Sequence, residues 1–546
     1  MEIREEIRKS IERALKKVKA KKCPGVLLER PKEREHGDFS TNVAFSLVKE
    51  LKKSPQEIAK GLVEHIKPNP KIIEKVEETK GFINFFLTEK LLFENLIEIL
   101  DKKRTYGKSK MAKGEKILIE MVSVNPTGPL HIGHARGAAF ASTLANILEA
   151  SGYQVTREYY INDVGVQMEN LGKSLRARYL ERFDEKVKFP EYEYKGRYMF
   201  PISQELINAG DKYKKEKIEF FTQYGYKAIM KGIKKDLKDF GIKIDSWKKE
   251  SDLRKEGKVE ESLAVLKKKD YLYEKDGALW FRSSAFGDEK DRVIRKKDGS
   301  LTYLASDIAY HEDKFKRGFD RLIDIWGADH HGYVERIQAA ISALGYPKES
   351  LKILLYQLVR LFRSGAPVAM STRKGLFTTL RDVMEIEEVG RDILRFFFCM
   401  RSSGSHLDFD LELAKKESPE NPVYYIEYAH ARISSIFKKA KGKKIKRKKL
   451  QEIDLQLLHT PEEKNILRLL AFFPDIVASS ARSYQVHSIP NYLMELASEF
   501  HSFYNKHRVL SEGENLIQAR LALVEGIRIV LYNGLKLLGI EAPERM

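Results

Sequence analysis

The stretch from Lys116 to Ile161 restricts the possible folds more than any other part of the chain. It runs from the apolar segment KILIEMVSV through the loop NPTGP into a long Ala-rich segment that stops at Gly152, and then into YQVTREYYI. This order predicts a buried strand, a loop, a helix and a second strand, which together form a βαβ unit. We therefore expect a nucleotide-binding parallel sheet to begin here.

His131, Gly133 and His134 stand where the loop turns into the helix. A helix amino terminus presents unpaired N–H groups and partial positive charge, and a glycine lets a ligand approach the backbone. Two histidines three residues apart lie on one face of the first turn, where both can donate to phosphate oxygens. Helix capping or packing would explain a lone histidine pair better, but the preceding strand and loop favour a phosphate-binding site.

The rest of the chain divides around this unit. Residues 1–110 have the pattern of helices around one or two short strands, which is typical of a small α+β domain. Residues 111–385 contain strand-like stretches at LTYLASDIAY, RLIDIWGA and KILLYQLVR, interrupted at about 170–290 by a Lys- and Glu-rich insertion with helical periodicity. From residue 386 to 546 the 3.6-residue period dominates, which predicts a helical bundle.

Charge suggests the partner class. The 546 residues include 99 Lys and Arg against 79 Asp and Glu, a formal charge of +20. An excess of this size attracts polyanions, so nucleic acid is the leading partner. A surface of mixed-sign ion pairs without any ligand explains the composition equally well. The basic tract Lys438–Lys449 is better explained as a solvated helix end and loop, although its charge can reach phosphate.

Cysteines and apolar runs bear on the compartment. Only Cys23 and Cys399 are present, which excludes a disulfide framework and a multi-cysteine zinc site and suits a reducing cytosol. The first residues are charged throughout and lack the apolar core of a signal peptide. No window reaches the roughly 18 apolar residues of a membrane helix. We expect a soluble, unprocessed, cytoplasmic protein that does not bind membranes.

The HIGH segment resembles the first signature of class I aminoacyl-tRNA synthetases, and VSVNPTGPLHIGHARGAA resembles the arginyl branch across its length. HGDFSTNVAF, SDIAYHEDKF, WGADHHGY and NPVYYIEYAHARISSIF agree in order, and the chain closes with a similar LLGIEAPERM. The resemblance therefore runs from end to end. It implies a multidomain α/β protein. A Rossmann-like parallel-sheet catalytic domain with an insertion would follow an amino-terminal tRNA-contacting domain and precede an all-α anticodon-binding bundle.

Substrate choice follows from charge, because a guanidinium needs planar bidentate acceptors and a buried cation needs a carboxylate. Glu120 and Asp307 end two apolar stretches, and we expect both at the carboxyl ends of sheet strands, where ligands bind. Tyr303, four residues before Asp307, would share one face of an extended strand with it. The alternatives are a solvated strand end for Glu120 and a helix cap for Asp307. The resemblance implies that Glu120, Tyr303 and Asp307 hold the guanidinium, while Ser123 and Asn125 hold the α-amino and carboxylate groups.

WGADHHGY places one Asp and two His side by side, and these residue types also ligate metals. Three consecutive ligands cannot easily converge on one ion, and no cysteine motif completes a shell, so we expect no metal bound by the protein. The resemblance implies that Asp329 lies beside the amino acid or the ribose. It also implies that ATP approaches Gly327 closely and binds at His131, Gly133 and His134.

The second class I signature, a mobile loop reading KMSKS, departs from its usual form here. VAMSTRKG keeps Met370 and Ser371, which the resemblance assigns to ATP, but has Ala369 and Thr372 where two lysines would stand. Lys374 lies just beyond, where a cation can neutralise the departing pyrophosphate. The alternative is an ordinary solvated loop. The implied catalytic set is His131, His134 and Lys374.

The carboxyl-terminal helices contain an aromatic and basic series suited to stacking on unpaired bases. Tyr424 and Tyr428 share one face of a helix, so either this face or the opposite one meets RNA while the other packs inward. Together with Arg432 they form the expected tRNA contact there. By resemblance, the amino-terminal domain touches the D-loop corner of the tRNA through Asn42 and Phe45.

The resemblance implies a two-step reaction. Arginine reacts with ATP and Mg²⁺ to give arginyl-adenylate and pyrophosphate, and the terminal adenosine of tRNA(Arg) then takes the arginyl group and releases AMP. We expect no tightly bound cofactor and a monomer, and the family generally needs tRNA before the first step. Chain length disfavours a small-molecule nucleotidylyltransferase. The presence of His131, His134, Glu120 and Asp307 disfavours a non-catalytic RNA-binding paralogue.

Overall fold

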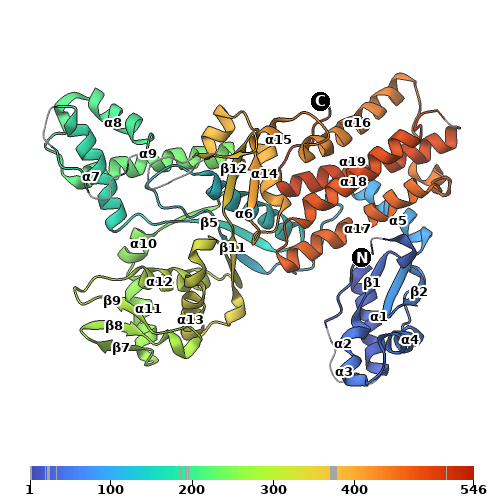
Figure 1. Ribbon diagram of the computed structural model, residues 1–546, viewed down its shortest axis with the longest axis horizontal. Coiled ribbons are helices and arrows are strands. Elements are labelled where there is room, and N and C mark those ends of the chain that lie inside the picture. The colour runs from blue at the N-terminus through green and yellow to red at the C-terminus, as the bar shows by residue number, and fades with distance from the viewer. Residues whose placement is uncertain are drawn as a thin grey trace.

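The computed structural model describes residues 3–18, 20, 25–31, 33–183, 187–190, 194, 196–368, 378–511 and 513–546. Figure 1 shows an elongated molecule with a sheet near its centre. Two inserted lobes extend to one side of this sheet, and the amino-terminal part and a helical bundle extend to the other. None of the described helices is long and apolar enough to cross a membrane.

The amino-terminal part packs helices against a small antiparallel sheet with strand order β1-β3-β2. Helix α4 begins at a capping box, in which Ser54 Oγ accepts from the Glu57 N–H and the Glu57 carboxylate accepts from the Ser54 N–H. This part therefore has the α+β character that its pattern predicts. Its elements are α1 (Ile3–Lys17), β1 (Phe39–Thr41), α2 (Val43–Ser46), α3 (Val48–Leu51), α4 (Pro55–His65), β2 (Ile73–Thr79), β3 (Phe82–Leu87) and the following α5 (Glu89–Lys102).

Five parallel strands form the central sheet in the order β11-β10-β4-β5-β6. β4 (Lys116–Glu120), α6 (Ile132–Ala150) and β5 (Gln154–Ile161) form the predicted βαβ unit, which confirms that prediction. β10 (Arg321–Gly327) pairs with β4 so that Asp324 lies beside Glu120. The outer strands are β6 (Ser246–Lys249) and β11 (Leu351–Tyr356).

Strand β6 lies inside the range 170–290 that we expected as one insertion, so the sheet is interrupted twice. The first lobe, between β5 and β6, contains α7 (Val166–Glu181), α8 (Met199–Asn208) and α9 (Ile218–Asp239). The second lobe, between β6 and β10, contains α10 (Glu250–Lys255), α11 (Lys258–Lys268), α12 (Tyr303–Lys316) and an antiparallel sheet of β7 (Leu272–Lys275), β8 (Ala278–Phe281) and β9 (Arg292–Arg295).

The prediction of a strand at LTYLASDIAY is wrong, because Thr302 takes the N-cap position of α12 and the helix starts at Tyr303. The apolar residues Leu304 and Ile308 lie one turn apart and are buried, which is a helical spacing that the short run did not separate from a strand. Tyr303 and Asp307 still share a face, as positions i and i+4 of a helix.

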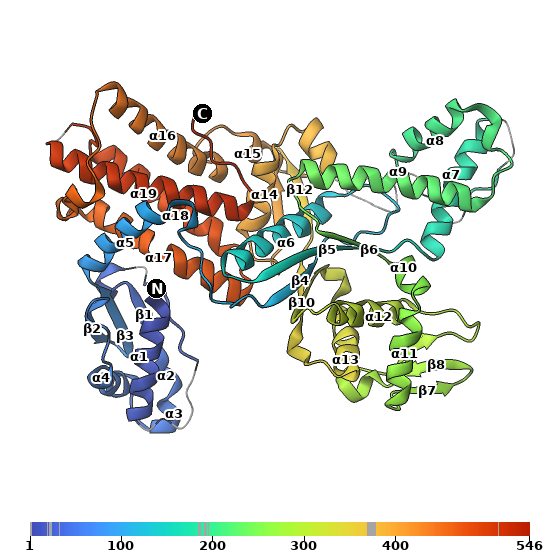
Figure 2. The same cartoon turned by 180° about the vertical axis from the view of Figure 1, so that it is seen from behind.

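Residues 386–546 are mostly helical, as predicted, although they also contain strand β14 (Leu407–Asp410), and the bundle packs against one side of α6. α6 contacts β5 on one side and the bundle helices on the other (Figure 2), and its alanines at 135, 138, 139, 141 and 145 are buried. The helix that begins beside His131 therefore shares its core with the bundle. The bundle comprises α14 (Arg391–Met400), α16 (Pro422–Gly442), α17 (Pro461–Ser483), α18 (Ser488–Lys506) and α19 (Glu514–Leu538). α13 (Val334–Leu344), α15 (Leu411–Lys415) and the small sheet of β12 (Val359–Arg363), β13 (Ala366–Pro367) and β14 (Leu407–Asp410) complete the framework.

Candidate active site

The chain turns sharply after β4. Val122 and Ser123 have φ values of 70° and 45°, a left-handed conformation that a β-branched residue rarely adopts. The turn is held on β5, because Ser123 Oγ accepts from the Tyr160 N–H at 3.0 Å and the Tyr159 hydroxyl donates to the Val124 carbonyl at 2.7 Å. The backbone strain therefore places the loop that leads to His131 over the carboxyl edge of the sheet.

His131 and His134 cap the start of α6 reciprocally. His131 Nδ1 accepts from the N–H groups of Gly133 and His134, and His134 Nδ1 accepts from the His131 N–H at 3.3 Å. The rings stack with centroids 3.3 Å apart. Burial lowers the pKa of His131 to about 4 and the pKa of His134 well below its ordinary value. Both imidazoles are therefore neutral at pH 7 and have their proton on Nε2, which makes Nε2–H a donor on each ring.

The segment after the second signature loop pairs with this turn. The Leu380 N–H donates to the Leu130 carbonyl at 2.8 Å, and the Ile132 N–H donates to the Thr378 carbonyl. The loop itself, residues 369–377, lies outside the described residues, and with it lie Ala369, Met370, Ser371, Thr372 and Lys374. The residues that directly follow it, 378–380, lie beside His131.

A buried ion-pair cluster lies under the site. Lys314 Nζ donates to Glu120 Oε2 at 2.6 Å and to Asp324 Oδ1 at 2.9 Å, and His311 Nε2 lies 2.7 Å from Asp324 Oδ2. Burial alone would raise the pKa of Asp324, but Lys314 and His311 hold it at about 2. Burial raises the pKa of Glu120 in spite of Lys314. Ligand atoms of Glu120, His311 and Asp324 lie within 4.8 Å of one another, a spacing that would also suit a metal ion, and here Lys314 supplies the positive charge.

Asp307 stands one helical turn away from this cluster. Its Oδ2 accepts from the Tyr333 hydroxyl at 2.7 Å, and burial raises the pKa of its carboxyl to about 6. Its backbone carbonyl lies 2.7 Å from His311 Nδ1, which connects it to the buried ion pairs. Tyr303, at the start of the same helix, is 54 % exposed. A cation beside Asp307 would therefore stabilise the charged form that burial disfavours.

Tyr160 has a buried hydroxyl close to three carboxylates. Its side chain is 8 % exposed and stacks on Tyr310 with ring centroids 4.0 Å apart. Burial and then the charges of Glu250, Asp307 and Glu120 raise the pKa of its hydroxyl. That hydroxyl has no hydrogen-bond partner among the residues the structure describes. A buried hydroxyl without a partner is costly, and its oxygen could accept a hydrogen bond from a ligand.

The remaining predicted residues surround the same edge of the sheet. Asn125 donates from Nδ2 to Gln167 Oε1 at 2.8 Å. Asp329 is exposed, and its charge acts on His131 to raise the pKa that burial lowers, so the two lie near each other. Gly327 ends β10, and a Cβ there would lie 2.5 Å from Asp329 Oδ1, the end of an exposed side chain. The structure therefore brings these residues to the region of the histidines.

The predicted tRNA contacts lie far from this edge. Tyr424 and Tyr428 stack with ring centroids 6.0 Å apart. Arg432 donates to the Tyr428 hydroxyl at 2.6 Å and lies over the rings of Tyr428 and Tyr504, at 4.4 and 4.7 Å from their centres. Phe45 is 43 % exposed, and Asn42 occupies the position before α2 without a side-chain capping bond. Half-buried aromatic and basic side chains therefore line one stretch of α16.

Six further residues that the structure brings to this region were not predicted from the sequence: Tyr160, Glu250, His311, Lys314, Asp324 and Tyr333. Lys314 and Tyr333 lie inside the quoted segments SDIAYHEDKF and WGADHHGY, so their neighbours were visible, but nothing in the spacing showed which groups they bond. Glu250 is buried and accepts from Ser306 Oγ at 2.7 Å. Its signal in the sequence, a single Glu after WKK, is indistinguishable from a solvated charge.

Family comparisons agree with this geometry. The chain matches the arginyl tRNA synthetase N terminal domain over residues 5–87, the class I (R) tRNA synthetase catalytic domain over residues 95–392 and the DALR anticodon binding domain over residues 426–546. A parallel sheet with a histidine-capped helix at its carboxyl edge, followed by a helical anticodon-binding domain, defines a class I aminoacyl-tRNA synthetase.

Individual relatives show which member of this class the chain resembles. The chain is 48 % identical to the arginine–tRNA ligase of Citrifermentans bemidjiense, over 96 % of this chain and 95 % of that protein. A crystal structure of a putative arginyl-tRNA synthetase from Campylobacter jejuni is 38 % identical with a TM-score of 0.77, covering 84 % of this chain and all of that one. Thermus thermophilus arginyl-tRNA synthetase, 24 % identical, shares the fold over the full length of both chains with a TM-score of 0.78. The chain belongs to the arginyl-tRNA synthetase family, whose members are ATP-dependent arginine–tRNA ligases.

Proposed function

We propose that arginine and ATP react at the carboxyl edge of the central sheet, with His131 and His134 as the donors that stabilise the transition state. The arginine carboxylate attacks the α-phosphorus of ATP, which enters as its Mg²⁺ complex, and pyrophosphate leaves. A ribose hydroxyl of the terminal adenosine of tRNA(Arg) then attacks the adenylate, and AMP leaves. The observation that carries this proposal is the reciprocal cap, which gives each neutral imidazole an Nε2–H donor.

The phosphate chain of ATP would lie along the start of α6, with Gly133 and the end of β10 at Gly327 beside it. Met370 and Ser371 would contact the nucleotide from the loop, and Lys374 would neutralise the pyrophosphate. The pairing of Leu380 with Leu130 supports this arrangement, because it places the residues that follow the loop beside the histidines. Catalysis is then positioning plus charge stabilisation, without a protein nucleophile.

The arginine side chain would lie against Asp307, with the ring of Tyr303 packing over it and Tyr160 as an additional hydroxyl. A guanidinium beside Asp307 would stabilise the charged form of its carboxylate, which burial disfavours. Glu120 already pairs with Lys314, so it would act through the residual negative charge of the cluster that it forms with Asp324 and Lys314. Ser123 and Asn125 would take the α-amino and carboxylate groups, and Asp329 would stand beside the amino acid or ribose.

Residues 1–110, 111–385 and 386–546 would act as the amino-terminal tRNA-contacting, catalytic and anticodon-binding domains. Tyr424, Tyr428 and Arg432 would meet the anticodon, and Asn42 and Phe45 would meet the D-loop corner. The stacked, half-buried series on α16 supports the first of these contacts, since rings of this kind stack on unpaired bases. We further propose that the protein works as a monomer in the cytoplasm without a tightly bound cofactor.

Pyrophosphate exchange tests the proposed site. Exchange should depend on arginine and ATP, and should be measured with and without tRNA. Citrulline matches the shape of arginine but has a neutral urea in place of the guanidinium. If carboxylates select the substrate, citrulline should support less exchange than arginine by a factor of roughly 10² or more, because the buried carboxylate would lack its cation. Similar exchange with citrulline would contradict the proposed acidic pocket.

A further inference from the structure

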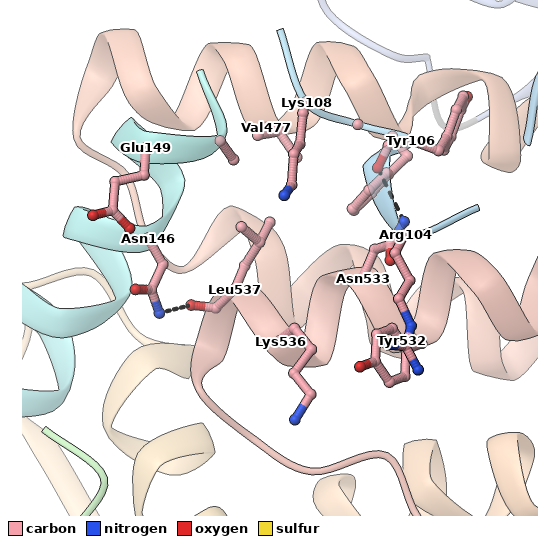
Figure 3. A pocket seen from close by; sticks show the side chains of 13 residues that line it. Arg104, Tyr106, Lys108, Asn146, Glu149, Val477, Tyr532, Asn533, Lys536 and Leu537 are labelled. Atoms are coloured by element: carbon pink, nitrogen blue, oxygen red, sulfur yellow. Dashed lines mark hydrogen bonds between the residues drawn. The ribbon is translucent and has the colours of Figure 1, made fainter. Parts of the chain in front are cut away.

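A basic pocket lies at the end of α6 opposite to the histidines. Its volume is about 360 Å³. From His131 to Glu149 the helix spans roughly 27 Å at 1.5 Å per residue, so the pocket is separate from the proposed active site. Four parts of the chain line it: the segment before β4, α6, α17 and α19 (Figure 3). The charged residues among its lining are Arg104, Lys108, Glu149 and Lys536.

Three cations of this pocket have no acidic partner among the described residues: Arg104, Lys108 and Lys536. The Arg104 guanidinium lies 5.1 Å from the centre of the Tyr532 ring, and the Lys536 amine lies 5.7 Å from the same centre. Figure 3 shows the Lys108 amine directed from its segment toward the α19 side of the pocket. Two positive charges therefore lie near the Tyr532 ring, and the amine of Lys108 adds a third from another segment.

The carboxylate in the lining does not offset these charges. Glu149 is engaged by Arg157, whose guanidinium donates to both of its oxygens at 2.7 and 2.8 Å. The walls are fixed by polar contacts, because Asn533 Nδ2 donates to the carbonyls of Lys103 and Tyr106 and Asn146 Nδ2 donates to the Leu537 carbonyl. The pocket therefore has walls held by hydrogen bonds and a net positive charge.

We propose that this pocket binds a phosphate group of the tRNA backbone. A planar guanidinium and two ammonium groups match the oxygens of a phosphodiester, and such contacts position a nucleic acid without reading its sequence. The backbone is the source the structure favours, because the pocket is built jointly by the segment after the amino-terminal part and by the bundle, the two parts that flank the catalytic sheet. The inference rests on the tRNA substrate of the family and does not depend on the roles proposed for the active-site residues.

The salt dependence of tRNA binding tests the proposal. Affinity of the full-length protein for its tRNA is measured by fluorescence anisotropy at several KCl concentrations, for Lys108→Gln, Lys536→Gln and the double variant. The double variant should reduce the slope of log Kd against log salt by roughly 0.7 to 1, the contribution of one phosphate contact, and each single variant by no more than this. Binding near 100 mM salt should weaken by roughly three- to tenfold per lost contact. Lys536→Arg keeps the charge and should keep the slope.

Lys267→Gln is the matched control, because Lys267 is an exposed lysine on α11 in the second lobe and its loss changes the net charge equally. An unchanged slope in the double variant overturns the proposal, and so does an equal change in Lys267→Gln, which would indicate a general field effect. Titration with inorganic phosphate at constant ionic strength distinguishes the source. If the double variant loses phosphate binding while its tRNA slope is unchanged, the pocket takes a free anion and the tRNA assignment is overturned.

Discussion

His134 supports the start of α6 with one ring nitrogen, and we propose that the other donates to ATP. His134→Ala removes both functions, so we expect adenylate formation to fall by roughly two to three orders of magnitude, as for loss of one preorganised donor. The lost cap should also cost about 1 kcal/mol of stability. His134→Asn separates the two effects, because its side-chain oxygen can accept from the His131 N–H while no distal N–H remains. Pyrophosphate exchange and melting temperature are measured for both. Wild-type exchange in His134→Asn would remove this residue from the mechanism.

Asp307 should make arginine binding dependent on pH. The pKa of its carboxyl is about 6 in the folded protein against an ordinary value of 3.8. The charged form that attracts a guanidinium is therefore present above pH 6 and lost below it. KM for arginine should be flat above about pH 7 and rise up to about tenfold per unit as the pH falls through 6, while KM for ATP changes little.

The variant Asp307→Asn supplies the control for this pH dependence. It should raise KM for arginine roughly ten- to a hundredfold and abolish its rise at low pH. Because the folded pKa lies above the ordinary one, ionisation of Asp307 disfavours the fold as pH rises from about 4 to 6. The Asn variant should thus melt no lower than the wild type at pH 7.5. Equal effects on ATP and arginine would mean that Asp307 organises the whole pocket.

Tyr160→Phe tests whether the unpartnered hydroxyl serves the substrate. The hydroxyl makes no hydrogen bond to the described residues, so its removal should leave the melting temperature unchanged or slightly raised. KM for arginine should increase by roughly tenfold, the worth of one hydrogen bond to a charged group. Tyr310→Phe is the matched control from the same ring stack, because its hydroxyl donates to Glu158 at 2.8 Å and its loss should lower stability. A wild-type KM in Tyr160→Phe would exclude the proposed contact.

Among the elements, the second signature loop has the least usual sequence. Lys374→Ala should slow adenylate formation in single-turnover experiments while arginine and tRNA affinities stay nearly intact, because only the transition state contains a departing pyrophosphate. Thr372→Lys in that background should recover part of the rate, since a charge a few ångströms away on the loop reaches the same oxygens. Full activity of Lys374→Ala would mean that the metal and the two histidines meet this charge.

How far the sequence predicts the elements depends on the length of each pattern. The βαβ unit from Lys116 to Ile161 and the carboxyl-terminal bundle have long patterns, and both are confirmed. The run LTYLASDIAY is short and rich in residues that suit strands, and it is a helix because its apolar residues Leu304 and Ile308 lie one turn apart and face one core. Strand β6 has only four residues inside a charged region, so its membership of the sheet could not be predicted from its neighbours.

Residues of the site can be predicted from the sequence only where they lie close together along the chain. The capping pair His131 and His134 lies within one turn, so its position at the start of α6 follows from spacing. By contrast, Lys314 meets Glu120 across 194 residues of sequence. No local pattern encodes that contact, because it arises from the pairing of β4 with β10 and the packing of α12 against them. The same holds for the hydroxyl of Tyr160 and its three carboxylates.

At the scale of the whole molecule, the sheet and the bundle share one core through α6. A fragment ending at residue 385 would expose the apolar side of α6 that now contacts α14, α17 and α19. Exposed surface of this kind drives association, so we expect the fragment to aggregate or to bind a hydrophobic dye. The full chain should unfold its sheet and bundle together in a calorimeter. Separate transitions for the two parts would contradict the shared core.

The enclosed position of α6 also limits how such a protein can be recombined. Its buried alanines face side chains of the bundle, and methylene groups added to a packed interface of this kind typically cost about 1 to 3 kcal/mol. A chimera that exchanges bundles between relatives at residue 386 would therefore combine two surfaces that were never matched. We expect such chimeras to fold more often when α6 and the bundle come from the same relative. The first turn of α6, however, belongs to the proposed active site of the catalytic part.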